Sequence, residues 1–305
     1  IGALQLLLDR GEQLDWFASA EIGIEAGVAL LALYMLLVHV LTAEDAFVDA
    51  RMFQDRNFVV GQVLIFAIGA ILLATLALLT PFLERLMNYP VLEAGLVLAP
   101  RGLGTMVSMV IVGRLVDRTG PRLLIIVGLL LTAFALYEMS TFTPDVSRSA
   151  IIRTGIVQGF GLGLVFVPLS TATFATIAPR FRTQGTAFFS LTRNIGSSVG
   201  ISITTFLLAR YTTTMHAELA THINLFSLAV QKYAPLLHLA TPAGRARLDA
   251  QVELQAAAIA YSDNFRLMAY AALTVIPLVL LLRRPSAVPV RLRTLAGVTE
   301  SSQAQ

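Results

Sequence analysis

Seven apolar runs, each long enough to cross a lipid bilayer, restrict the folds open to this sequence. A transmembrane helix needs about 20 predominantly apolar residues, with a rise of about 1.5 Å per residue. Hydrophobic residues make up 56% of the chain and charged residues only 13%, against about 25% charged residues in a soluble domain. We therefore predict an all-α polytopic membrane protein with spans at 24–43, 58–82, 91–112, 123–141, 151–177, 185–209 and 265–282.

The composition argues against an enzyme. The chain has no cysteine and its four histidines lack the His-x-x-x-His spacing of a zinc-binding helix, so we expect no disulfide, no metal site and no cofactor. Lys232 is the only lysine, which leaves no phosphate-binding loop of the Gly-Lys-Ser/Thr type. Residues 196–200 match the Gly-x-Ser-x-Gly pattern of serine hydrolases, but they lie inside an apolar run instead of at a strand-to-helix turn.

The basic residues predict the orientation of the spans. They stand singly or in pairs beside apolar runs, as membrane-flanking charges do, so nucleic acid is not an expected partner. If the spans alternate, one side is arginine-rich and should be cytoplasmic. That side carries Arg51, Arg56, Arg114, Arg118, Arg122, Arg180, Arg182, Arg283, Arg284, Arg291 and Arg293.

A charged turn at 113–122 separates two of the spans. We expect Gly113 and Gly120 to adopt backbone angles that other residues avoid, so that about ten residues reverse the chain. Asp117 is suited to stabilise a neighbouring helix N-terminus, and Arg118 and Arg122 are suited to pair across helices. The two glycines need no role beyond forming a tight turn. The three charged residues, however, predict a gate at the cytoplasmic face.

These residues resemble a family pattern. Gly113, Leu115, Asp117, Arg118, Gly120 and Arg122 fall on the cytoplasmic Gly-x-Leu-x-Asp-Arg-x-Gly-x-Arg pattern of major facilitator transporters. The segment 100–104 in the preceding span adds to this pattern. The segments 8–11 and 14–17, the extra span, the segment 51–53 before Asn57 and Phe58, and the long outer segment look like the fourteen-helix drug:proton antiporters of the EmrB/QacA type. The resemblance covers nearly the whole chain.

The resemblance implies a domain organisation. Residues 1–57 would hold the end of an upstream helix, a linker transmembrane helix and a cytoplasmic loop. Residues 58–284 would form the C-terminal six-helix half, with a long periplasmic loop at about 210–263 that contains an amphipathic helix at 245–260. Residues 285–305 would be a cytoplasmic tail. The N-terminal half, to which the residues usually linked to proton coupling belong, would be missing.

Polar residues within the spans are candidates for a substrate or proton path. Arg101 and Arg193 lie deep in their spans, where insertion scales assign arginine a cost of about 2.5 to 3.5 kcal/mol. Both are equally well explained as clamps to backbone carbonyls. Gln158 and Asn194 add polar contacts, and Gly155, Gly159 and Gly163 recur every four residues, which favours close helix packing.

The resemblance implies transport by alternating access. The expected function is multidrug efflux by proton antiport in the bacterial inner membrane, with an amphipathic substrate, protons, membrane lipid, the missing half and a periplasmic adaptor as partners. A non-transporting membrane scaffold, or a truncated transporter half, would have the same sequence features. Export of a siderophore or a lipid is an alternative within the pump class.

Overall fold

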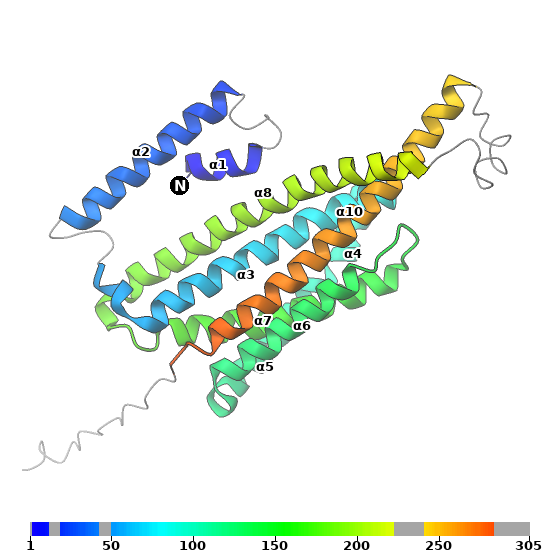
Figure 1. Ribbon diagram of the computed structural model, residues 1–305. Coiled ribbons are helices and arrows are strands. Elements are labelled where there is room, and N and C mark those ends of the chain that lie inside the picture. Colours follow the sequence, from blue (N-terminus) through cyan, green and yellow to red (C-terminus); the bar gives the residue numbers. More distant parts are fainter. Residues whose placement is uncertain (1, 12–18, 43–49, 223–240, 284–305) are drawn as a thin grey trace, which may run out of the picture.

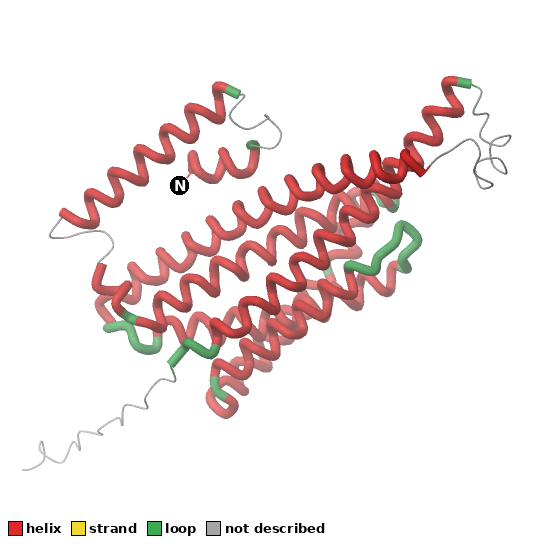
Figure 2. The backbone as a smooth tube through the Cα atoms, in the orientation of Figure 1, coloured by secondary structure: helices red, strands yellow, loops and turns green. Residues whose placement is uncertain are grey.

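The computed structural model describes residues 2–11, 19–42, 50–222 and 241–283, and helices account for most of them, without a strand in these ranges (Figures 1 and 2). Two helices precede a bundle: α1 (Gly2–Arg10) and α2 (Ala20–Thr42). The bundle contains α3 (Arg56–Pro81), α4 (Val91–Leu98), α5 (Pro100–Thr119), α6 (Pro121–Met139), α7 (Arg148–Phe174), α8 (Arg182–His222) and α10 (Pro242–Val279).

Hydroxyl and carboxylate caps mark where several bundle helices begin. The side chain of Asp55 accepts a hydrogen bond from the backbone N–H of Phe58 at the start of α3. Ser147 caps α7 in the same way, and Thr241 caps α10. Such caps satisfy backbone donors that the first helical turn leaves unpaired. The sequence therefore encodes these helix starts locally.

Four helical segments in the described ranges are long and apolar enough to cross a membrane: Arg56–Leu86, Val91–Val116, Pro121–Met139 and Arg148–Phe174. They coincide with four of the expected spans. The helices α8 and α10, with 41 and 38 residues, are longer and carry more polar residues. Their helical structure continues into the segment expected as an outer loop, up to His222 on one side and from Pro242 on the other.

The bundle helices pack in a network centred on α3 and α7. The helix α3 packs against α8, while α7 packs against both α5 and α6; α10 crosses α6 and α8. One core cluster contains Phe82, Leu136 and Phe265, and a second contains Leu64 and Leu129. The helix α2 lies apart from the bundle, with α1 between it and α8 (Figure 1).

The chain reverses direction from helix to helix, so that arginines expected on one side gather at one end of the bundle. The beginnings of α3 and α8, the α5–α6 turn and the end of α10 lie at this end (Figure 1). We call it the arginine-rich end; within the described residues it includes Arg56, Arg118, Arg122, Arg180, Arg182 and Arg283. The alternating directions agree with the predicted topology.

The expected span 91–112 lies within the segment Val91–Val116, but its helix is interrupted at Ala99: α4 ends at Leu98 and α5 begins at Pro100, where proline lacks the N–H that would continue the hydrogen-bond ladder. One local expectation about the backbone was wrong. The charged turn is much shorter than ten residues. Gly113 lies inside α5, and among the described glycines only Gly120, with φ 78°, has a positive φ.

Candidate functional site

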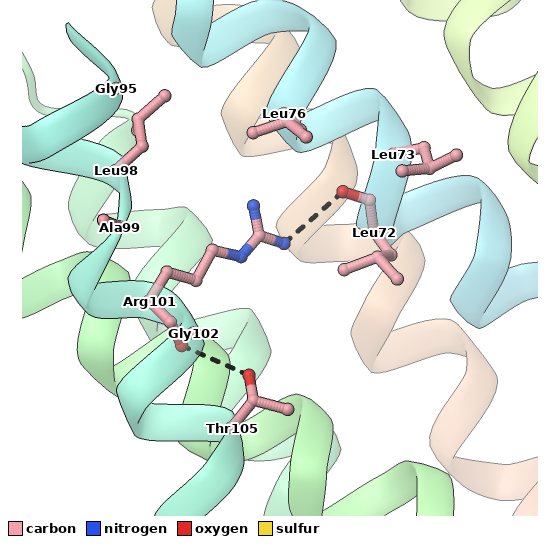
Figure 3. A pocket seen from close by; sticks show the side chains of 9 residues that line it. All are labelled: Leu72, Leu73, Leu76, Gly95, Leu98, Ala99, Arg101, Gly102 and Thr105. Carbon is pink, nitrogen blue, oxygen red and sulfur yellow. Dashed lines mark hydrogen bonds between the residues drawn. The ribbon is translucent and has the colours of Figure 1, made fainter. Parts of the chain in front are cut away.

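Arg101 lies just after the α4–α5 break and extends its guanidinium group toward α3. Its Nη2 donates a hydrogen bond to the backbone carbonyl oxygen of Leu72, at 3.4 Å (Figure 3). The side chain borders a pocket of about 560 Å³ that is otherwise mostly apolar. The lining residues are Leu72, Leu73, Leu76, Gly95, Leu98, Ala99, Arg101, Gly102 and Thr105.

The glycines of α7 hold the backbone of α5 close at this point. A Cβ atom at Gly159 would collide with the carbonyl oxygen of Arg101, and one at Gly163 would meet the Ser108 side chain at 2.7 Å. The Thr105 hydroxyl adds a hydrogen bond of 3.1 Å to the Gly159 carbonyl oxygen. The backbone of Arg101 thus packs against α7, and its side chain points away from α7 toward α3.

A buried hydrogen bond connects α7 to α3. Gln158 Nε2 donates to the hydroxyl oxygen of Thr75 at 3.2 Å, and that hydroxyl donates to the Ile71 carbonyl at 2.6 Å. Both side chains are fully buried. The Gln158 Oε1 atom has no hydrogen-bond partner among the described residues. The bundle interior therefore contains polar groups with unused hydrogen-bonding capacity.

Arg193 on α8 meets the same part of α3 from another side. A Cβ at Gly69 would collide with the Arg193 carbonyl oxygen, and Ser197 donates to the Gly69 carbonyl at 3.1 Å. The Arg193 guanidinium carbon lies 5.7 Å from the centre of the Phe166 ring, within cation–π range. Asn194, the next residue, is exposed. The turn of α3 from Gly69 to Leu72 thus contacts both intramembrane arginines.

Hydrogen bonds at the arginine-rich end join the charged turn and the start of α3 to the end of α10. Arg122 Nη2 donates to the carbonyl oxygen of Leu282. Asn57 donates to the Arg283 carbonyl oxygen at 3.1 Å and accepts from the Arg283 N–H at 2.7 Å. Arg118 is exposed. Asp117 is in the last turn of α5, and its side chain lies outside the part that the structure describes.

Sequence reasoning singled out Arg101, Arg193, Gln158 and Arg122 but missed their partners. The motif includes Arg122, yet nothing in it predicts a carbonyl at the end of α10. Thr75 was missed because threonine is common in apolar helices, where it bonds its own preceding turn. Asn57 was missed as a contact because it stands at a span boundary, where a polar residue is ordinary.

Two overlapping stretches of the chain, residues 15–201 and residues 58–290, match the profile of the family described as Major Facilitator Superfamily. The stretches together include all of the bundle helices described above. The match agrees with the family expected from the charged turn.

Several curated bacterial proteins are similar to the chain. It is 32% identical to the Multidrug export protein EmrB of Escherichia coli (strain K12) over 74% of its own length and 44% of the relative's. It is 31% identical to EmrB of Haemophilus influenzae over 76% and 46% of the two lengths. It is 32% identical to the Fatty acid resistance protein FarB of Neisseria gonorrhoeae over 77% and 46%. The chain thus spans less than half the length of these relatives.

Proposed function

Because this chain belongs to the major facilitator superfamily, whose members are membrane transporters and not enzymes, we propose that it is the C-terminal half of a multidrug exporter driven by proton antiport. The observation that carries the proposal is the placement of Arg101 in an apolar pocket between α3 and α5. An ionisable residue inside a membrane bundle is by default a candidate for a substrate or ion pathway.

The proposed domains follow the helices. Residues 58–284 would form the C-terminal half, and residues 1–57 would supply the end of an upstream helix, the linker helix and a cytoplasmic loop. Residues 285–305, which lie outside the described residues, would be a cytoplasmic tail. The arginine-rich end is cytoplasmic in the bacterial inner membrane, by the excess of positive charge on that side. The last part of α8, at 210–222, and the first part of α10, at 242–263, then project on the periplasmic side, where an adaptor protein would dock.

Alternating access is the proposed mechanism. A substrate cavity would form between this half and an N-terminal half, with the Arg101 pocket on its wall, and rocking of the halves would expose it to each side in turn. The contacts of Arg122 and Asn57 at the arginine-rich end are suited to hold the C-terminal half as a unit. Asp117 and Arg118 would then contact the N-terminal half in one state only and bias the equilibrium toward it.

Extrusion from everted membrane vesicles tests the proposal. The complete reading frame that encodes this chain is expressed in an efflux-deficient bacterium, and uptake of anionic, neutral and cationic fluorescent amphiphiles by the vesicles is measured. We expect uptake of at least one of them that collapses when a protonophore abolishes the gradient. No uptake of any amphiphile by protein shown to be in the membrane would contradict the proposal and favour a scaffold.

A further inference from the structure

We propose that the Arg101 pocket selects anionic amphiphiles, compounds in which a carboxylate or sulfonate is joined to an apolar ring or chain. The inference rests on the proposed transport function and adds the charge of the substrate to it. Arg101 would bind the acidic group, and the leucines of the pocket would bind the apolar part.

The guanidinium group of Arg101 is largely uncommitted. Its one hydrogen bond within the described residues is the 3.4 Å contact with the Leu72 carbonyl, which is long for an N–H···O bond. No carboxylate among the described residues lies within ion-pair distance of Arg101. An arginine carries five donors in a planar fork that fits a carboxylate or a sulfonate. The group therefore has the donors and the charge to bind an anion.

The surrounding sequence does not neutralise this charge. Five stretches that make up most of the bundle contain no aspartate or glutamate: 56–83, 94–116, 121–137, 148–217 and 264–282. Arg193, the second intramembrane arginine, contacts α3 at Gly69, one turn before Leu72. That contact is made by the Arg193 backbone, while its guanidinium group lies over the Phe166 ring of α7, so Arg101 brings the positive charge to this segment of α3. An anionic ligand would be attracted, and a cationic ligand repelled by the same Coulomb interaction.

The backbone of Arg101 is held in place before a ligand arrives. Gly159 on α7 packs against the Arg101 backbone carbonyl, and Thr105 bonds both that carbonyl, at 3.2 Å, and Gly159. A binding group on a rigid element loses little conformational freedom when it meets its ligand. The leucines at 72, 73, 76 and 98 give the apolar part of the ligand a surface beside the charge (Figure 3).

Two dyes that differ only in an acidic group test this inference. Anilinonaphthalene sulfonate is anionic, and phenylnaphthylamine is the same aromatic framework without the sulfonate. Each is titrated by fluorescence against the purified full-length protein, and each is then assayed for gradient-driven transport in proteoliposomes. The variants are Arg101→Gln, which removes the charge, Arg101→Lys, which keeps it, and Arg153→Gln as a control at an exposed ion pair with Glu138.

We expect Arg101→Gln to weaken binding and transport of the sulfonate at least about tenfold, which corresponds to about 1.4 kcal/mol. Binding and transport of the neutral dye by Arg101→Gln should change less than about twofold. Arg101→Lys should keep most of the preference for the anion, and Arg153→Gln should resemble the unmodified protein. Equal losses for both dyes in Arg101→Gln, or no loss for either, would overturn the inference.

The two readouts separate this inference from the proposed function. Arg101-dependent preference for the anion in binding, without gradient-driven transport of either dye, would support charge selection and contradict the export proposal. Transport of both dyes at rates independent of residue 101 would support export and overturn charge selection.

Discussion

Asn57 and Arg283 are 226 residues apart in the sequence and form a reciprocal pair of hydrogen bonds. The Asn57 amide donates to the Arg283 carbonyl oxygen at 3.1 Å and accepts from the Arg283 N–H at 2.7 Å. The pair joins the start of α3 to the residue that follows the end of α10, and Asn57 is only 1% exposed. One side chain thus satisfies two backbone groups beyond a helix end, where no intrahelical partner exists.

Replacing Asn57 should therefore destabilise the bundle. Asn57→Leu removes both hydrogen bonds and leaves the backbone N–H and C=O of Arg283 unpaired, so we expect a loss of about 1 to 3 kcal/mol of stability. Thermal unfolding of the purified protein in detergent measures this loss as a lower melting temperature. Gln62→Leu is the matched control on the same helix, because the buried Gln62 amide has no partner among the described residues. An equal loss in the two variants would contradict the role given to Asn57.

The contact between Gly159 and Arg101 predicts opposite effects of alanine at two glycines. Gly159→Ala places a methyl group against the Arg101 carbonyl oxygen, and overpacking of this kind costs about 1 to 3 kcal/mol. Gly113→Ala meets no atom within 4 Å and lies inside α5, so it should be neutral or stabilising by up to about 1 kcal/mol. Melting temperatures of both variants test this. Destabilisation by Gly113→Ala would show that this position requires a backbone conformation that only glycine adopts easily, and would contradict the prediction.

Asp117→Asn should reduce transport while leaving the protein folded. The residue lies in the last turn of α5, just before the reversal at Gly120, and its charge is proposed to bias one access state. Loss of an interaction made in one state only should lower gradient-driven transport by about tenfold, equivalent to about 1.4 kcal/mol. Asp145→Asn, an exposed position in the loop between α6 and α7 at the opposite end of the bundle, is the control. Wild-type transport by well-expressed Asp117→Asn would refute the gate.

Sequence reasoning predicts the parts of this molecule that depend on local pattern. The lengths of the apolar runs predicted the helices α3, α6 and α7. The charged motif predicted that Arg122 contacts another helix. The break before Pro100 was missed, although proline in a first helical turn is its local signal. The short turn at Gly120 was missed because helical structure persists through the charged residues before it.

Contacts between distant segments were not predictable from the sequence. A carbonyl group such as that of Leu72 or Leu282 is present at every residue, so only packing decides which carbonyl an arginine reaches. The close approach of a neighbouring helix to α7 was suggested by the spacing of Gly155, Gly159 and Gly163, although the spacing does not identify that helix as α5. The spacing does not say that Arg101 lies opposite them, or that the side chain consequently turns to α3.

Accessibility of the Arg101 pocket from the two sides of the membrane tests alternating access most directly. The chain contains no cysteine, so Gly102→Cys places a single thiol in it, at a pocket-lining position with no atom within 4 Å of an added Cβ. The complete protein, with any cysteine elsewhere replaced, is labelled in oriented vesicles by an impermeant thiol reagent added to one side or the other. Transport by alternating access predicts labelling from both sides, with the faster side reversing when the proton gradient is inverted. Labelling from one side alone, whatever the gradient, would contradict the account.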